Sequence, residues 1–332
     1  MNQHVVGVDI GGTTVKLAVV RSEVHSQPQV TGQPAPIAPT HRILKTATID
    51  TLADQPGAET ARRIAVAARE LAASAGCTRI DGVGVGCPGL VNNVDGSIIV
   101  SANLPGFRNL PLAALIEKEI GAPVSVQNDA NAAALGEFQF GVSAQGCRNM
   151  VLLTLGTGVG GGVICDGKLL VGADNAAAEL GHVKVEYGPD AFACGCGRKG
   201  CVEAYAGIAG IGRLAKSHLA KTPSPRLTPD VATTKAITEA ARAADPAGLA
   251  ILYSVGQYLG RAIANFVDTF NPEKVILAGG ASRATEFLLP GIRQSMVDHC
   301  SFAATRDRTT VEASAIPDDI NVLGAAAVFL NR

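Results

Sequence analysis

Three cysteines and a histidine have the residue types and the spacing of a zinc site. Residues 194–201 read CGCGRKGC, and the segment ELGH at 179–182 precedes them. One imidazole and three sulfurs form a complete tetrahedral ligand set for Zn²⁺, with no position left open. The sequence therefore predicts a structural zinc site within a small element at 179–203. Its ligands would be His182, Cys194, Cys196 and Cys201.

Two glutamates, Glu179 and Glu203, flank this cluster and are not needed to complete it. A zinc-bound histidine normally donates its second ring N–H to another group. A hydroxylated ligand could accept that bond while the two carboxylates accept its O–H groups. We interpret the zinc as a clamp that holds a polar wall. The alternatives are small buried cysteines, which the density of thiols disfavours, and a nucleic-acid zinc knuckle, which the absence of a basic run in the chain disfavours.

Two glycine-rich turns have the composition of phosphate-binding loops. DIGGTT (9–14) and GTGVGGG (156–162) each follow an apolar run. Glycine lets backbone amides approach phosphate oxygens because no Cβ blocks them, and Asp9 could hold hydrated Mg²⁺ against a nucleotide. A single loop of this kind could be only a tight hairpin turn. Two related loops, together with LAGGAS at 277–282, favour nucleotide binding.

A carboxylate at a strand-to-helix junction is the candidate general base. QNDANAAALGE (127–137) places Asn128 and Asp129 at this junction. An aspartate there could simply cap the helix. Beside a nucleotide it could instead accept the proton of a hydroxyl that attacks a γ-phosphate. SANLPGF (101–107) adds Asn103, which could hydrogen-bond the same substrate or form an ordinary turn.

The elements that would position these residues follow a repeated plan. HVVGVDIGGTTVKLAVV (4–20) and MVLLTLGTGVGGGVIC (150–165) each predict a β-hairpin with a glycine-threonine turn. KVILAGGAS (274–282) predicts a third strand that ends in glycines. The distance between the two hairpins along the chain is typical of duplicated domains, not of a solenoid.

Helical and strand patterns alternate between the hairpins. The helical segments are 57–76, 111–121 and 130–141, and the strand segments are 80–89 and 122–129. This alternation predicts a parallel sheet with covering helices in each of two lobes. Two segments are predicted to be surface loops, 22–41 and 220–233, and the last helix, 319–332, is predicted to return to the first lobe.

The composition excludes several classes of protein. The 332 residues are 47% hydrophobic, which is enough for two cores, and the net charge is −1 with no basic run. Binding to nucleic acid or to an anionic membrane is therefore not expected. The sequence shows neither a signal-peptide pattern nor an apolar stretch long enough to span a bilayer. We expect a cytoplasmic protein with reduced thiols, which disfavours disulfides.

Taken in order, these motifs resemble the ROK family of sugar kinases and repressors, within the actin-like ATPase superfamily. The resemblance covers almost the whole chain, and the combination EXGH, eleven residues, CXCGXXGCXE is highly specific. The chain is most similar to the bacterial ATP-dependent glucokinases of that family. The resemblance implies a two-lobed, ribonuclease H-like α/β fold with a cleft between the lobes. Residues 1–127 and 319–332 would form the smaller lobe, and residues 128–318 the larger one.

The resemblance also assigns roles to individual positions. Asp129 resembles the base that deprotonates the 6-hydroxyl of a sugar, and His182 would bind both the sugar and zinc. The implied sugar ligands are Asn103, Asn128, Asp129, Glu179, His182 and Glu203. The implied residues for ATP and Mg²⁺ are Asp9, Gly11, Gly12, Thr13, Thr14, Lys16, Gly156, Thr157, Gly158, Gly279 and Gly280. The partners would be a sugar, ATP and, in the usual family pattern, a second copy in a homodimer, with a tetramer as the alternative.

The expected reaction converts ATP and D-glucose to ADP and D-glucose 6-phosphate. N-acetylmannosamine, N-acetylglucosamine, mannose and fructose stay open as substrates, because discrimination depends on loop geometry that the sequence does not display. Polyphosphate is a donor for related kinases, which tend to lack the thiol cluster. A sugar-sensing repressor is disfavoured, because Asp9 lies too close to the first residue for a preceding helix-turn-helix domain. The segment 22–41 is longer than the usual connection in the family.

Overall fold

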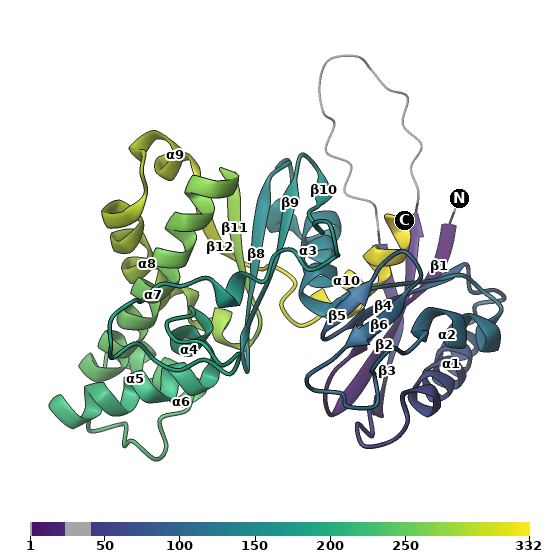
Figure 1. Cartoon of the computed structure of the whole chain (residues 1–332), viewed down its shortest axis with the longest axis horizontal. Helices are drawn as coiled ribbons and strands as arrows, with labels where there is room; N and C mark the ends of the chain where they lie inside the picture. Colours follow the sequence, from purple (N-terminus) through teal and green to yellow (C-terminus); the bar gives the residue numbers. More distant parts are fainter. Residues whose placement is uncertain (1, 24–40) are drawn as a thin grey trace. The chain divides into compact units, whose positions relative to one another are not determined.

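The computed structural model describes residues 2–23 and 41–332 of the chain. Most of the proline-rich segment predicted as a loop, residues 24–40, lies outside the described residues. The chain divides into two compact units (Figure 1). Unit 1 comprises Met1–Gly146, Leu169–Ala178 and Asp318–Arg332, and unit 2 comprises Cys147–Lys168 and Glu179–Pro317.

Unit 1 is built on a mixed sheet with the strand order β3-β2-β1-β4-β7. Strands β1 (Asn2–Ile10) and β2 (Thr14–Glu23) form the first predicted hairpin, and β3 (His41–Asp50) continues it antiparallel. Strands β4 (Gly82–Cys87) and β7 (Val124–Asn128) run parallel to β1. The hairpin turn reverses the chain, so the sheet is mixed where the sequence predicted parallel strands.

Helices cover both faces of this sheet. Helices α1 (Gly57–Ser74) and α2 (Leu112–Ile120) pack over a core that includes Val6, Val8 and Val85. On the other face, α10 (Ile320–Leu330) packs against β1 and β4, as the sequence predicted for the last helix. It approaches the strands closely because they carry glycine, and a methyl group on Gly84 would lie 1.8 Å from the carbonyl oxygen of Ala325.

Helix α3 (Asp129–Phe140) packs against α10, and this contact keeps it in unit 1. The sequence placed the lobe boundary after residue 127, one helix earlier than the boundary that the structure shows at Gly146. The sequence did not predict this boundary because α10, on which α3 packs, lies far away along the chain. Strands β5 (Leu90–Asn92) and β6 (Ser97–Val100) form a separate antiparallel pair that leads into the SANLPGF segment.

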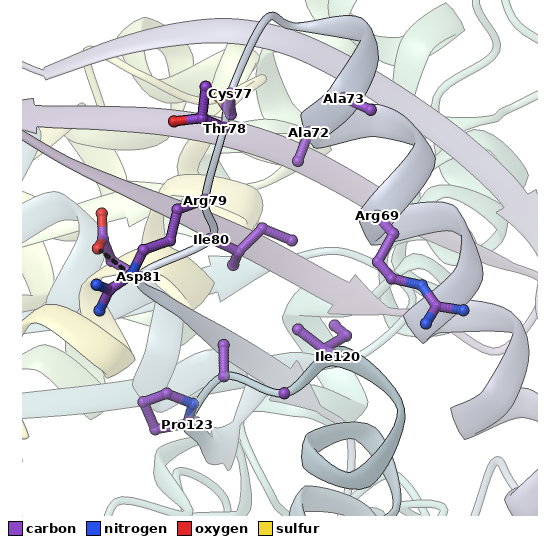
Figure 2. A pocket seen from close by; sticks show the side chains of 12 residues that line it. Arg69, Ala72, Ala73, Cys77, Thr78, Arg79, Ile80, Asp81, Ile120 and Pro123 are labelled. Carbon is purple, nitrogen blue, oxygen red and sulfur yellow. Dashed lines mark ion pairs between the residues drawn. The ribbon is translucent and has the colours of Figure 1, made fainter.

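A surface pocket of about 440 Å³ lies where β4 and β7 begin, between the ends of α1 and α2 (Figure 2). Ile80 and Ile120 lie inside it, and Arg79 forms an ion pair with Asp81 over 3.2 Å at its side. Parallel strands share their direction, so this pocket lies at the opposite edge of the sheet from the predicted catalytic residues. Those residues follow the carboxyl ends of the same strands.

Unit 2 repeats the plan with a sheet of order β10-β9-β8-β11-β12. Strands β8 (Met150–Leu155) and β9 (Val159–Cys165) form the second predicted hairpin, which continues into β10 (Lys168–Leu169). Strands β11 (Lys274–Ala278) and β12 (Thr310–Ala313) follow in parallel with β8. In both units the first hairpin strand pairs with its hairpin partner on one side and with a parallel strand on the other. The repeated plan that the sequence predicted is confirmed.

The helices of unit 2 follow the segment with the predicted zinc ligands and β11. They are α4 (Glu203–Ala206), α5 (Ile208–Lys221), α6 (Thr234–Arg242), α7 (Pro246–Phe270), α8 (Thr285–His299) and α9 (Ala303–Arg308). The predicted loop at 220–233 joins α5 to α6, although Leu227 within it is buried. Across residues 2–23 and 41–332, no helix combines the length and the apolar character that a bilayer span requires.

Candidate active site

The predicted catalytic residues of unit 1 lie at one edge of its sheet, where the carboxyl ends of β1, β4 and β7 meet. Asp9 lies in register with Gly86, and Cys87 lies in register with Asn128. Burial, and then the carboxylates of Asp129 and Asp9, raise the pKa of the Cys87 thiol well above its usual value. Both acidic side chains therefore lie near this buried residue. The carboxyl edge of parallel strands is where α/β proteins bind ligands.

Asp9 is a buried carboxylate with few protein partners. Its side chain is 9% exposed, and its Oδ2 accepts a hydrogen bond of 3.1 Å from Asn321 of α10. Burial raises the pKa of Asp9, while the bond from Asn321 and the charge of Lys16 oppose the shift. A buried carboxylate in this position favours a nearby cation. Its oxygen chemistry suits Mg²⁺.

Asn128, and not Asp129, caps helix α3. The Oδ1 of Asn128 accepts hydrogen bonds from the amides of Ala130 at 2.9 Å and Asn131 at 3.2 Å, and its Nδ2 donates to the carbonyl of Gly89. Asp129 is the first residue of the helix, and its Oδ1 also accepts from the Ala130 amide. The capping role that the sequence left open for Asp129 thus belongs to its neighbour. Asn103 lies exposed in the bend that follows β6.

Each glycine loop uses one of its own amides to close the turn and leaves others unused. The Gly11 amide donates to the Thr14 carbonyl at 2.9 Å, and the Gly156 amide donates to the Gly158 carbonyl at 3.0 Å. Within the part of the chain that the structure describes, no protein acceptor takes the amides of four loop residues. These are Gly12, Thr13, Thr157 and Gly158. Both loops can therefore donate to an anionic ligand.

A pocket of about 520 Å³ adjoins the second glycine loop in unit 2. Its lining includes two residues that the sequence predicted, Gly156 and Gly280. Gly279 is instead required by packing, since its φ is +84° and a methyl group there would lie 2.6 Å from the Leu155 carbonyl oxygen. The other lining residues are Leu155, Ile208, Thr234, Lys235, Thr238, Glu239, Arg242, Ala281 and Arg283.

The wall that α6 contributes to this pocket was not predicted. Its apolar face, with Ile237 and Ala241, is buried, and its polar face contributes Lys235, Glu239 and Arg242 to the pocket. The Oγ1 of Thr234 is buried and has no hydrogen-bond partner among the described residues. A buried hydroxyl without a partner is costly, so this atom indicates a place where a ligand can bind.

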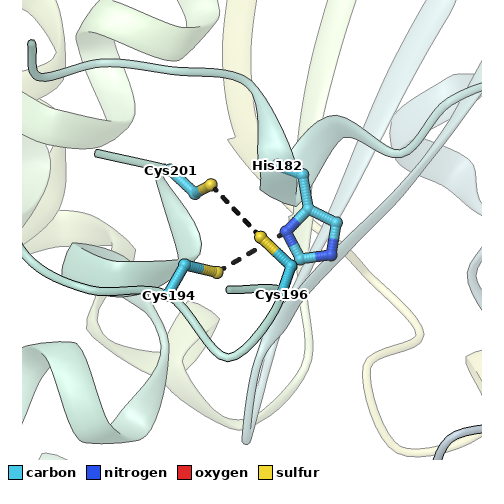
Figure 3. A group of neighbouring side chains, drawn as sticks. All are labelled: His182, Cys194, Cys196 and Cys201. Atoms are coloured by element: carbon cyan, nitrogen blue, oxygen red, sulfur yellow. Dashed lines mark hydrogen bonds between the residues drawn. The ribbon is translucent and has the colours of Figure 1, made fainter. Parts of the chain in front are cut away.

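The four predicted zinc ligands lie together in unit 2 (Figure 3). Their ligand atoms all fall within 4.8 Å of one another, with Cys196 Sγ 3.7 Å from Cys201 Sγ and Cys194 Sγ 3.7 Å from His182 Nδ1. Tetrahedral Zn²⁺ with ordinary bond lengths places two sulfurs about 3.8 Å apart and a sulfur and a nitrogen about 3.6 Å apart. The residues therefore fit zinc in both type and distance.

The three thiols differ in pKa because their surroundings differ. A hydrogen bond from Arg198 lowers the pKa of the exposed Cys196 to about 6, whereas burial raises the pKa of Cys194 to about 12 and also raises that of Cys201. A metal binds the thiolate, so Cys196 is ready to ligate near neutral pH, and the two buried thiols need the charge of the metal. The turn that carries the cysteines requires glycine at position 200, because the φ of Gly200 is +80° and a methyl group there would lie 1.8 Å from the Glu186 carbonyl oxygen.

The residues predicted to form a polar wall lie on the same element as this cluster. Figure 3 shows one ring nitrogen of His182 facing the sulfurs and the other pointing away from them. Glu203 accepts a hydrogen bond of 3.2 Å from the Cys194 thiol at Oε1 and one of 3.1 Å from the Val159 amide at Oε2. Glu179 is exposed just before the short helix that carries His182.

An aromatic stack, which the sequence did not predict, anchors the element that carries the cysteine-histidine cluster. Phe192 stacks on Tyr205 with ring centroids 4.7 Å apart, and Tyr205 stacks on Tyr258 of α7 at 3.9 Å. Arg213 and Arg261 lie over the outer rings, 4.9 Å and 5.0 Å from their centroids. Each stacked pair of rings, and each contact between a cation and a ring, stabilises the fold by about 0.5–1.5 kcal/mol. The stack therefore holds the element to the helices independently of a metal.

Several known proteins are similar to this chain in sequence and in structure. The family model for the ROK family matches residues 5–332. The chain is 38% identical to the glucokinase of Thermotoga maritima, over 98% of this chain and 97% of that protein. It is 32% identical to the xylose repressor of Caldicellulosiruptor bescii, over 75% of this chain and 62% of the repressor. A crystal structure of a ROK family glucokinase from Streptomyces griseus, in complex with glucose and AMPPNP, shares 32% identity, with a TM-score of 0.75 and coverage of 97% of this chain and 98% of that one.

Proposed function

The chain belongs to the ROK family, and we propose that it is an ATP-dependent glucokinase. The observation that carries this proposal is the match to glucokinases over nearly the whole of both chains. The repressor, in contrast, extends well beyond the part that matches. The reaction transfers the γ-phosphoryl group of ATP to the 6-hydroxyl of D-glucose.

The nucleotide is assigned to the glycine loops and the unit 2 pocket. The pocket beside Gly156 and Gly280 would take the adenosine, with the unpartnered Thr234 hydroxyl as one of its hydrogen-bonding groups. The unused amides of the two loops would donate to phosphate oxygens. Asp9 would hold hydrated Mg²⁺, which neutralises charge on the phosphates. Lys16 and Thr14 remain proposed contacts of the first loop.

The sugar is assigned to Asp129 and the polar wall. Asp129 would accept the proton of the 6-hydroxyl as this oxygen bonds to the γ-phosphorus and the bond to ADP breaks. Asn103, Glu179 and the free ring nitrogen of His182 would bind the other hydroxyls. The Oδ1 of Asn128 already caps α3, and one Nδ2 proton binds the Gly89 carbonyl. The second Nδ2 proton is therefore the group that remains for the sugar. Glu203 would contribute its Oε1.

Zinc is proposed to occupy the cluster of His182 and the three cysteines as a structural ion. Cys194 must lose its proton to become a ligand, which ends its donation to Glu203. The Oε1 of Glu203 then becomes available to a sugar hydroxyl. We also propose that the protein forms a homodimer, with a tetramer as the alternative, and light scattering of the purified protein decides between these states and a monomer.

A panel of sugars tests the proposed activity. ADP release should be stimulated most strongly by D-glucose, measured as kcat/KM with a coupled assay. Mannose, fructose, N-acetylglucosamine and N-acetylmannosamine complete the panel, and polyphosphate replaces ATP in a parallel series. A different preferred sugar would correct the substrate and keep the kinase. No stimulation by any sugar would show that the chain is not a sugar kinase.

Gly12→Ala tests the first phosphate loop. A methyl group at Gly12 would meet no atom of the protein within 4 Å, so the melting temperature should not change. The methyl group would nevertheless occupy space that phosphate needs, and the KM for ATP should rise about tenfold while the KM for glucose stays the same. Gly212→Ala is the matched control, because its methyl group is also unobstructed and lies on α5. An unchanged KM for ATP in Gly12→Ala would remove this loop from the nucleotide site.

A further inference from the structure

Glu203 connects the zinc-binding element to the second glycine loop. Its Oε2 accepts the amide N–H of Val159, the residue at which β9 begins, at 3.1 Å. A methyl group on Gly158 would lie 2.3 Å from the same oxygen, so the carboxylate fills the space beside this residue. The contact lies wholly within unit 2.

A second contact joins the same two segments. The amide of Ile208, just after α4, donates to the Gly156 carbonyl at 3.2 Å. Glu203 is the first residue of α4, and Tyr205 in the same helix is 2% exposed at the centre of the aromatic stack. The helix is therefore firmly held, and it fixes the carboxylate against the loop.

The hydrogen bonds around this loop leave two of its amides without a protein acceptor among the described residues. Glu203 takes the Val159 amide and Gly158 takes the Gly156 amide, so the two amides between them, those of Thr157 and Gly158, stay free. A carboxylate is a strong acceptor for a backbone amide. Loss of this acceptor would free the start of β9 and let the loop relax out of the conformation that presents both donors.

We propose that Glu203 is a positioning residue for the phosphate loop, and that it supports nucleotide binding even when no sugar is bound. This proposal rests on the proposed function only in taking loop 156–158 as a phosphate site. It predicts a second role for a side chain that was expected to bind only the sugar.

Two nearly isosteric substitutions separate the acceptor from the packing. Glu203→Gln keeps an oxygen that can accept from Val159, and Glu203→Met fills a similar volume without an acceptor. In sugar-free protein of verified zinc content, calorimetric titration with ADP and Mg²⁺ should give a Kd within about threefold of wild type for Glu203→Gln. The Kd for Glu203→Met should be weaker by about tenfold or more.

Glu179→Ala is the control, because Glu179 is an exposed, proposed sugar ligand on the same element. It should raise the KM for glucose and leave the sugar-free Kd for ADP unchanged. Equal ADP affinity in Glu203→Met and wild type would overturn the inference, whatever happens to the KM for glucose. Equal losses in Glu203→Gln and Glu203→Met would overturn it too, since they would point to lost charge and not to a lost acceptor. The sugar panel on the wild-type protein tests the proposed function separately.

Discussion

Asp129→Asn is expected to lower kcat for glucose phosphorylation by about 10²–10⁴-fold and to leave glucose binding nearly unchanged. Asparagine has the same shape as aspartate but cannot accept the proton of the 6-hydroxyl. The fold should tolerate the change, because the side chain of Asn128 caps α3 and stays in place. Removing one negative charge from the first helical turn should cost about 0.3–1 kcal/mol of stability. Coupled ADP release, calorimetric glucose binding and thermal melting measure the three effects.

Asp81→Asn is the matched control for this substitution. It makes the same change of charge in the same unit, at the edge where β4 begins and not where it ends. It weakens the ion pair with Arg79 and retains an oxygen that can accept from the His4 amide. Normal kcat is expected for Asp81→Asn. Near-normal kcat in Asp129→Asn would exclude Asp129 as the general base.

Local sequence chemistry predicts the two hairpins and the clustering of His182 with three cysteines. A glycine-threonine turn between two apolar runs is a local signal, and it correctly located both β1–β2 and β8–β9. The cysteine-histidine cluster is also local, since its three cysteines lie within eight residues and its histidine precedes them on the same element. The helix stop at Gly121, which adopts the left-handed conformation at the end of α2, is a third case.

What the sequence did not predict depends on contacts between distant segments. Helix α3 belongs to unit 1 because α10, from the far end of the chain, packs on it. The polar face of α6 has no distinctive pattern, and only the fold shows that it lines a pocket. The alternative roles of Asp129 could not be separated either, because two adjacent residues can each cap a helix and only the geometry shows that Asn128 does so.

The contacts of Glu203 illustrate the same limit at a single residue. The motif CXCGXXGCXE shows that a carboxylate follows the last cysteine, but it does not show that the carboxylate reaches the loop at 156–158. One side chain thus contacts both Cys194, a proposed zinc ligand, and Gly158 in the proposed phosphate loop. The proposed metal site, sugar wall and phosphate loop of unit 2 therefore share this one side chain.

Cys196→Ala should abolish zinc binding and raise the KM for glucose by about 10–100-fold, the loss typical of a disturbed metal site. Cys196 is exposed, so its removal creates no cavity, whereas Cys201 is fully buried and its loss would also disturb packing. The aromatic stack should keep residues 186–193 attached to the helices, so the overall fold should survive. The released segment is the turn at 194–201 together with His182. Metal analysis, circular dichroism and glucose kinetics measure these effects.

Cys300→Ala is the control, since Cys300 is partly exposed in unit 2 and lies outside the cluster. It should keep about one zinc per chain and normal glucose kinetics. The free amides of Thr157 and Gly158 lie outside the turn at 194–201. In Cys196→Ala, the KM for ATP should therefore change far less than the KM for glucose. Zinc-free protein with an unchanged KM for glucose would refute the clamp. A parallel rise of both KM values would instead show that loss of the metal also disturbs the loop at 156–158, for which Glu203 provides the direct contact.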